Sequence, residues 1–242
     1  VNMPKSNTNS NKGWKDLPWR KIEKEIFEQQ LQIYKATRDD NIQQVRKLQK
    51  RLVNSHTAKL LATKRVTQDN RGRKTSGIDA KLADTSRTRF QLASDLAIAT
   101  TALPLRRVWI PKPGKTEKRP LGIPTIRDRA LQALLKLVIE PEWEAKFEPN
   151  SYGFRPGRNC HDAVKALAGF CHQKPRYVLD ANIAKCFDKI DHAKLLDKLG
   201  YSGSFRRQIL FWQKSGVLDN DIFSETEMGT PQGGVISPLL AN

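Results

Sequence analysis

Acidic and amide residues follow a short apolar run in the stretch 176–192, which reads RYVLDANIAKCFDKIDH. We expect residues 177–179 to form a buried β-strand. Asp180 and Asn182 would then project from one face of it, because side chains alternate along a strand. Carboxylate and amide oxygens in such a position can hold a divalent metal ion. The pattern therefore predicts a metal-holding strand, with Phe187 and Asp188 following after a turn of backbone.

The balance of charge points to a polyanionic partner. The 242 residues include 43 Lys and Arg against 25 Asp and Glu, a formal net charge of +18. An excess of this size favours nucleic acid, with an anionic membrane surface as the weaker alternative. No stretch approaches the roughly 18 apolar residues of a transmembrane helix, and the polar start lacks the apolar run of a secretory signal. We therefore expect no membrane partner.

The number and spacing of the cysteines indicate whether the protein works in a reducing or an oxidising compartment of the cell. Cys160, Cys171 and Cys186 are odd in number and include no CxxC pair. This favours three buried thiols in a reducing compartment over a disulfide framework or a zinc site. We expect a protein of the bacterial cytoplasm or of an organelle, and not a secreted one.

The basic residues among the first hundred positions are predicted to lie on helices. We expect a disordered leader over residues 1–12 and a helical region over 13–100. The apolar spacing predicts helices that start at Trp19, after Asp39 or Asp40, and after Ser55, with a weaker one within 80–100. Their polar faces are either solvated surface or a face for nucleic acid, which the one-sided charge favours. The residues concerned are Arg46, Lys47, Lys50, Arg51, Lys64 and Arg65.

Two further stretches combine basic residues with turn chemistry. Residues 68–79 lack apolar periodicity and predict an exposed loop, whose Arg71, Arg73 and Lys74 can follow a phosphate backbone. Residues 150–159 place Arg155 and Arg158 beside two aromatic residues. That combination suits base stacking with phosphate contact, and it equally suits plain packing.

A β-hairpin is predicted over 105–124, with strands at 105–110 and 119–124. Its tip and return strand carry four cations, Lys112, Lys115, Lys118 and Arg119. These cations repel one another, and an anionic ligand such as a triphosphate or a nucleic-acid backbone would relieve that repulsion. Further helices are expected at 128–140, bounded by Pro141, and at 160–171, 192–200 and 205–216. A glycine-rich segment follows at 229–234, and another helix begins after it.

Four of these stretches, in this order, resemble reverse transcriptases encoded by group II introns. They are residues 119–124 (RPLGIP), 151–155 (SYGFR), 183–192 (IAKCFDKIDH) and 229–238 (GTPQGGVISP). The resemblance covers roughly residues 14–242. It implies an α+β fold, the fingers and palm of a right-hand polymerase behind a helical, RNA-binding N-terminal extension. Residues 101–242 would form the fingers and part of the palm, truncated before the catalytic Asp-Asp hairpin.

The resemblance also implies roles for individual residues. Lys112 and Arg119 would hold the triphosphate of an incoming deoxynucleotide, and Gln232 would lie near it. Phe187 would be the gate that excludes a ribose 2′-hydroxyl. The partners would be group II intron RNA, an RNA template with a DNA primer, and deoxynucleoside triphosphates. Proteins of this family also assist splicing as maturases.

The expected cofactor is Mg²⁺, held as a pair of ions that activate the primer and clamp the phosphates. The family's first metal-binding Asp precedes the Ile of the palm strand, and here that position is Asn182. A neutral amide, even with the Ile183 backbone carbonyl, would hold the metal weakly. We therefore expect either a reverse transcriptase fragment that makes no DNA by itself or an inactive, RNA-binding maturase remnant. A basic RNA-binding domain unrelated to polymerases would have to produce four ordered motifs by chance.

Overall fold

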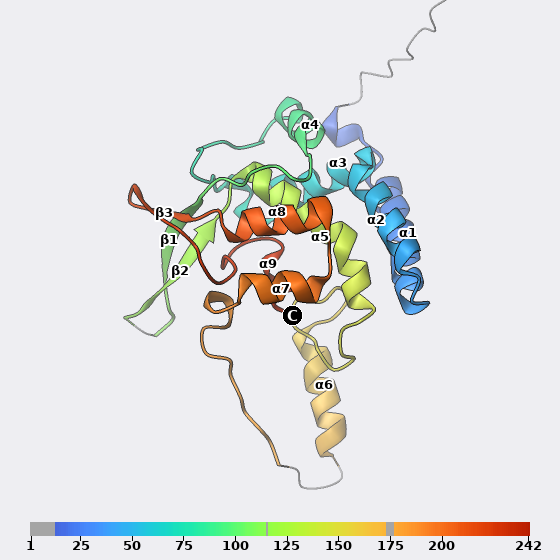
Figure 1. Ribbon diagram of the computed structural model, residues 1–242, viewed down its shortest axis with the longest axis vertical. Coiled ribbons are helices and arrows are strands. Elements are labelled where there is room, and N and C mark those ends of the chain that lie inside the picture. Colours follow the sequence, from blue (N-terminus) through green and yellow to red (C-terminus); the bar gives the residue numbers. More distant parts are fainter. Residues whose placement is uncertain (1–12, 115, 173–176) are drawn as a thin grey trace, which may run out of the picture.

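The computed structural model describes residues 13–114, 116–172 and 177–242 (Figure 1). The expected disordered leader, residues 1–12, lies outside this range, as does Lys115 of the hairpin tip. The described chain combines helices with one mixed sheet, which confirms the predicted α+β class.

The N-terminal region is helical, as predicted. Its elements are a 3₁₀ turn Trp14–Asp16, α1 (Trp19–Arg38), α2 (Ile42–Asn54), α3 (His56–Lys64), a π-helical turn Arg65–Asp69, a 3₁₀ turn Arg71–Lys74 and α4 (Ser86–Asp95). Ser55 caps α3 as expected. The cap expected for α2 at Asp39 or Asp40 is wrong, because Asp39 ends α1 and Asp40 adopts a left-handed φ of 52°. Asn41 supplies that cap instead.

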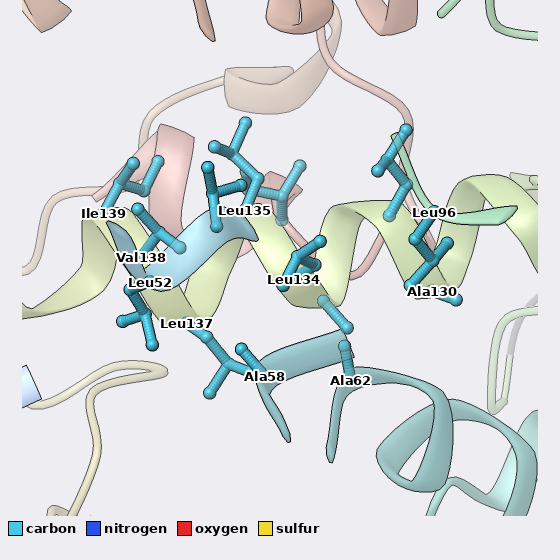
Figure 2. Packing of buried hydrophobic residues seen from close by; sticks show 14 of the residues in the cluster. Leu52, Ala58, Ala62, Leu96, Ala130, Leu134, Leu135, Leu137, Val138 and Ile139 are labelled. Carbon is cyan, nitrogen blue, oxygen red and sulfur yellow. The ribbon is translucent and has the colours of Figure 1, made fainter. Parts of the chain in front are cut away.

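Helix α5 (Ile126–Glu144) runs through the centre of the molecule. Helices α1, α2 and α3 all pack against it. Figure 2 shows the close contact of Leu134, Leu137 and Val138 of α5 with Leu52 of α2 and with Ala58 and Ala62 of α3. These small alanines allow α3 to approach α5 closely. The core therefore joins the N-terminal helices to the rest of the chain.

The predicted end of this helix at Pro141 is wrong. The helix continues for three residues beyond it, to Glu144. Proline lacks the N–H that would bond the carbonyl four residues earlier. In this molecule Gln30 of α1 donates to that carbonyl, on Leu137, and so replaces the missing bond.

The sheet has the strand order β2-β1-β3-β4. The predicted hairpin is confirmed by β1 (Leu105–Pro111) and β2 (Lys118–Ile123), which pair antiparallel with Arg107 opposite Gly122. Strands β3 (Val217–Asp219) and β4 (Ile222–Ser224) were not foreseen. They have three residues each, too few to show periodicity, and β3 adds parallel to β1.

The remaining helices follow the predicted order. They are α6 (Cys160–Cys171), α7 (His192–Leu199), α8 (Gly203–Gln213) and α9 (Ser237–Ala241), with a 3₁₀ turn at Cys186–Asp188. The expectation of buried thiols is wrong for Cys160 and Cys171, which are exposed. The reason is that α6 projects from the body and buries none of its residues (Figure 1).

The buried strand predicted at 177–179 is also wrong. Tyr177, Val178 and Leu179 are 107%, 83% and 89% exposed, and the segment runs as an extended trace between α6 and the turn at 186–188 (Figure 1). Within the described part of the chain, residues 177–184 make no backbone hydrogen bond. A strand needs a neighbour to pair with, and the described sheet lies elsewhere. Asp180 and Asn182 are therefore not held on a common strand face.

Candidate functional site

A cavity of about 230 Å³ lies where the β-hairpin meets the turn at 186–188 and the glycine-rich segment. Arg107, Pro120 and Gly122 line it from the hairpin, Phe187 and Asp188 from the turn, and Gln232 from the glycine-rich segment. Residues from three separated parts of the chain thus meet in one hollow. It presents one cation, an aromatic ring, an amide and three carboxylates, those of Asp188, Glu225 and Glu227, to anything that enters.

The glycine-rich segment fits tightly against the hairpin. The Gly122 N–H donates to the Gln232 carbonyl at 2.9 Å. Gly233 has a φ of +110°, and a Cβ there would meet the Gly122 carbonyl at 2.9 Å. Only glycine combines that backbone conformation with so close an approach. Gln232 consequently lies at the cavity with its side-chain Nε2 3.5 Å from Asp188 Oδ1.

The predicted nucleotide-binding residues are only partly brought together. Gln232 and the predicted gate Phe187 line the cavity, whereas Lys112 and Arg119 do not. Lys112 Nζ instead pairs with Glu117 Oε2 at 2.7 Å on the exposed hairpin, and this contact lowers the pKa of Glu117. Arg119 is exposed on β2.

Arg107 is the cation that does line the cavity, and sequence reasoning missed it. Its guanidinium lies 5.8 Å from the centre of the Trp109 ring, whose indole N–H donates to Asp219 on β3. The signal was present in the alternation of the predicted strand 105–110, where positions 107 and 109 share a face.

The residues assigned to the metal do not fit Mg²⁺ as they stand. Asn182 and Ile183 lie on the exposed, unpaired segment and do not line the cavity. Across the described ranges, no group of three or more His, Cys, Asp or Glu residues is arranged to hold a metal ion. Magnesium requires several oxygen ligands at about 2.0–2.1 Å. These residues therefore support no chemical step through a metal.

The basic residues predicted to bind RNA fall on several surfaces. Lys47, Lys50 and Arg51 line a groove of about 530 Å³ between α1 and α2. Arg65 lines another groove, between α1, α5 and the 150–157 loop, together with the exposed rings of Phe27 and Phe154. Both hollows offer cationic side chains to solvent.

Arg71, Arg73 and Lys74 lie on an exposed 3₁₀ turn that is fixed from beneath. Buried Arg129 of α5 donates to the carbonyls of Gly72 and Thr75, and Arg106 of β1 donates twice to Ser76. Neither arginine was singled out from the sequence. This turn is therefore attached to the same hairpin that forms the cavity.

Four predicted RNA-binding residues have partners within the protein. Arg155 is buried, and its guanidinium donates to both carboxylate oxygens of Glu144. Arg158 donates to the carbonyls of Pro149 and Ser151. Lys64 pairs with Glu23 and Asp69, and Arg46 pairs with Glu142. These contacts give each residue a structural role, whatever else it binds.

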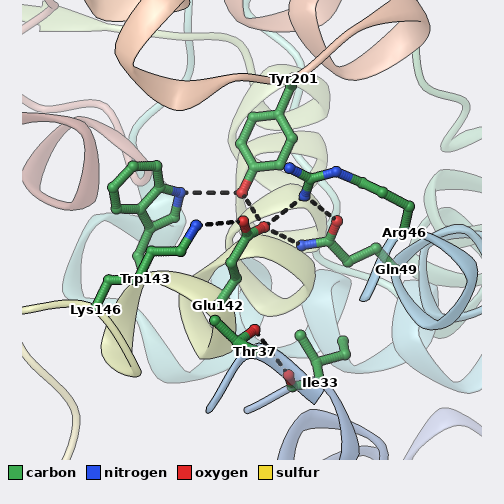
Figure 3. A network of polar contacts seen from close by, with 8 residues as sticks. All are labelled: Ile33, Thr37, Arg46, Gln49, Glu142, Trp143, Lys146 and Tyr201. Atoms are coloured by element: carbon green, nitrogen blue, oxygen red, sulfur yellow. Dashed lines mark hydrogen bonds and ion pairs between the residues drawn. The ribbon is translucent and has the colours of Figure 1, made fainter. Parts of the chain in front are cut away.

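The Arg46 contact belongs to a buried network centred on Glu142 (Figure 3). Arg46 Nη1 lies 2.6 Å, Gln49 Nε2 2.8 Å and the Tyr201 hydroxyl 2.9 Å from Glu142 Oε2, while Lys146 reaches the other oxygen at 2.7 Å. Burial acts to raise the pKa of Glu142, but Lys146 and Arg46 outweigh it and hold this pKa below its usual value. The network joins α2, the end of α5 and the loop between α7 and α8.

Two family models match this chain. Residues 14–96 match the family model for the N-terminal domain of reverse transcriptase, and residues 110–242 match that for reverse transcriptase (RNA-dependent DNA polymerase).

Individual relatives come from bacteria and from a eukaryote. Protein YkfC of Escherichia coli strain K12 is 36% identical over 193 residues, 74% of this chain and 50% of that protein. Group II intron-encoded protein LtrA of Lactococcus lactis subsp. cremoris is 39% identical over 142 residues, 57% of this chain and 24% of LtrA. Maturase-like protein 1 of Euglena gracilis is 31% identical over 153 residues, 59% of this chain and 31% of that protein. The chain thus spans half or less of these curated relatives. Among its described helices, none is long and apolar enough to cross a membrane.

Proposed function

This chain belongs to the reverse transcriptase family, and we propose that it forms the fingers and part of the palm of a group II intron-encoded RNA-directed DNA polymerase. On this proposal residues 13–100 are the RNA-binding extension and residues 101–242 are the fingers and partial palm. Deoxynucleoside triphosphates, an RNA template with its DNA primer, and group II intron RNA are the proposed ligands.

The observation that carries this proposal is the composition of the cavity. Phe187, Gln232 and Arg107 meet there, although they lie on a turn, a loop and a strand far apart in sequence. A cation beside an aromatic ring suits a phosphate and a sugar or base held together. The lining also carries three carboxylates, so further cations must offset their charge when a triphosphate binds. The lysine and arginine of the hairpin, Lys112 and Arg119, would act at its rim, with Lys112 first leaving Glu117.

RNA binding is supported by the distribution of charge. The groove at Lys47, Lys50 and Arg51 and the turn at 71–74 present cations without a buried ion pair. Binding that neutralises phosphates weakens steeply as salt rises, because condensed counterions are released. We expect that behaviour with structured intron RNA.

A second candidate is a maturase-type protein that binds intron RNA without copying it. Asn182 favours this candidate, because it places a neutral amide where the family has a metal-binding Asp. The exposed, unpaired state of residues 177–184 favours it as well. In that case Mg²⁺ would be bound by the intron RNA and not by the protein.

The test compares the chain with its Asn182→Asp variant. Incorporation of a labelled deoxynucleotide on a primed RNA, with Mg²⁺, supports the polymerase where it is seen in either protein. Absence of incorporation fits both candidates, so binding of a fluorescent deoxynucleoside triphosphate is measured beside it. Salt-sensitive intron RNA binding without nucleotide binding by either protein supports the second candidate. Arg51→Glu combined with Arg65→Glu should reduce both the affinity for RNA and the salt slope. Unchanged RNA binding would remove these two surfaces from the proposal.

A further inference from the structure

His192 begins α7 and is buried, although the first residue of a surface helix is commonly solvated. Its Nε2 lies 2.7 Å from the backbone carbonyl of Gly229. A carbonyl can only accept, so Nε2 carries the proton and donates. The other ring nitrogen, Nδ1, is buried and has no hydrogen-bond partner within the described residues. The side chain is therefore held by a single directional contact, 37 residues away in sequence.

The residue that His192 contacts is itself constrained. Gly229 has a φ of +89°, and a Cβ on it would lie 2.7 Å from the Phe187 carbonyl and 3.0 Å from that of Asp188. The Gly229 N–H donates to the Ile190 carbonyl at 2.8 Å, and the Thr230 N–H donates to Phe187 at 2.7 Å. The glycine-rich segment is thus fastened directly to the backbone of the turn that carries Phe187.

The far end of the same segment is fastened to the opposite side of the cavity. Gly122 of β2 bonds the Gln232 carbonyl, and the Val235 N–H donates to the buried side chain of Gln132 in α5 at 2.8 Å. Residues 229–235 therefore connect the turn at 186–188 to the hairpin.

We propose that His192 is a positioning residue, which fixes the Gly229 carbonyl and thereby the distance between Phe187 and the β-hairpin across the cavity. In the described chain the Gly229 N–H donates to Ile190, but the Gly229 carbonyl accepts no backbone hydrogen bond, so His192 is its partner. The imidazole approaches from α7, whose start is fixed by the Asp191 cap on Lys194. Without it, the buried Gly229 carbonyl loses a partner and the segment can tilt. The consequence for nucleotide affinity rests on the proposed function.

The test uses three variants of the full chain. His192→Ala removes the contact, and His192→Gln keeps a donor at a similar distance from the backbone. His56→Ala is the matched control, because His56 also begins a helix, α3, but is exposed. Hydrogen exchange is measured at the amides of Gly229 and Thr230 and at those of α5. Binding of a fluorescent deoxynucleoside triphosphate is measured in parallel.

We expect exchange at Gly229 and Thr230 to rise roughly tenfold in His192→Ala, with α5 unchanged, and nucleotide affinity to fall by a similar factor. His192→Gln should recover most of both, and His56→Ala should change neither. Unchanged exchange at Gly229 and Thr230 would overturn the proposal. So would an equal rise in α5, which would report general unfolding, or faster local exchange with unaltered nucleotide affinity.

Failure of the proposed function is a distinct result. If the unaltered chain does not bind the nucleotide, the polymerase proposal loses support. The exchange measurements still decide whether His192 positions Gly229.

Discussion

The side-chain amide of Gln30 in α1 donates a 2.8 Å hydrogen bond to the backbone carbonyl of Leu137 in α5. That carbonyl is the one that an N–H at position 141 would bond in a regular helix, and position 141 is proline. A side chain 107 residues earlier thus completes the helix at its interruption. The contact also fastens the N-terminal helices to the central one.

Replacing Gln30 should therefore destabilise the protein through the Leu137 carbonyl. We expect Gln30→Ala to lower the unfolding free energy by about 1 kcal/mol, measured by urea denaturation. Gln29→Ala is the control, because among the described residues the Gln29 side chain bonds only that of Glu25, on the same helix.

A double-mutant cycle makes this prediction specific. In Pro141→Ala, the new N–H can bond the Leu137 carbonyl, so the loss of Gln30 should cost less there than in the unaltered chain. An equal cost in both backgrounds would show that Gln30 acts by packing alone.

The hydroxyl of Tyr201 should contribute measurably to stability. It donates to Glu142 and accepts from the Trp143 indole at 3.0 Å, so Tyr201→Phe leaves the buried Glu142 carboxylate and the partly buried Trp143 N–H each short of a partner. We expect a loss of about 1–3 kcal/mol in unfolding free energy. Tyr34→Phe should cost little, since the Tyr34 hydroxyl has no hydrogen bond to any residue that the structure describes. Similar losses in the two variants would contradict this account of the network.

Glu142 should contribute to stability in a pH-dependent way. Its pKa is lower in the folded protein than the ordinary 4.5, so its contribution is present above that value and is lost as the pH falls through the folded pKa. Burial raises the pKa of Asp128, which acts in the opposite sense. We therefore compare the unfolding free energy of Glu142→Gln with that of the unaltered chain. Asp128 is present in both, so its contribution to the pH dependence cancels in the difference. The difference in unfolding free energy should shrink below pH 4.5, and a constant difference would count against the charged network.

The segment 177–184 should be the first site of proteolysis. Cleavage requires an extended backbone free of hydrogen bonds, which this segment provides, and Tyr177 and Leu179 are exposed. We expect chymotrypsin, which accepts large apolar side chains, to cut after one of them before it cuts elsewhere in the described chain. Tyr177→Ser combined with Leu179→Ser should slow that first cut severalfold. A first cut within α5 or the hairpin would contradict the exposed arrangement.

Much of the local structure was predictable because it depends on neighbours in the sequence. The apolar spacing located α1, α2 and α3, Ser55 marked the start of α3, and a turn between two strand-like runs located the hairpin. The four ordered motifs were sufficient to identify the family. The predicted roles of Asn182, Lys112 and Arg119 remain predictions, since nothing in the fold tests them.

What the sequence determined by itself was the order and type of most elements, because propensity, capping and amphipathic period act over a few residues. Tertiary structure alone decided the rest. It showed that Pro141 does not end its helix, because Gln30 supplies the missing donor. It showed that 177–179 is not a buried strand, because no described strand lies beside it. It also brought Arg107 to the cavity and His192 to Gly229, since such contacts depend on how distant segments pack.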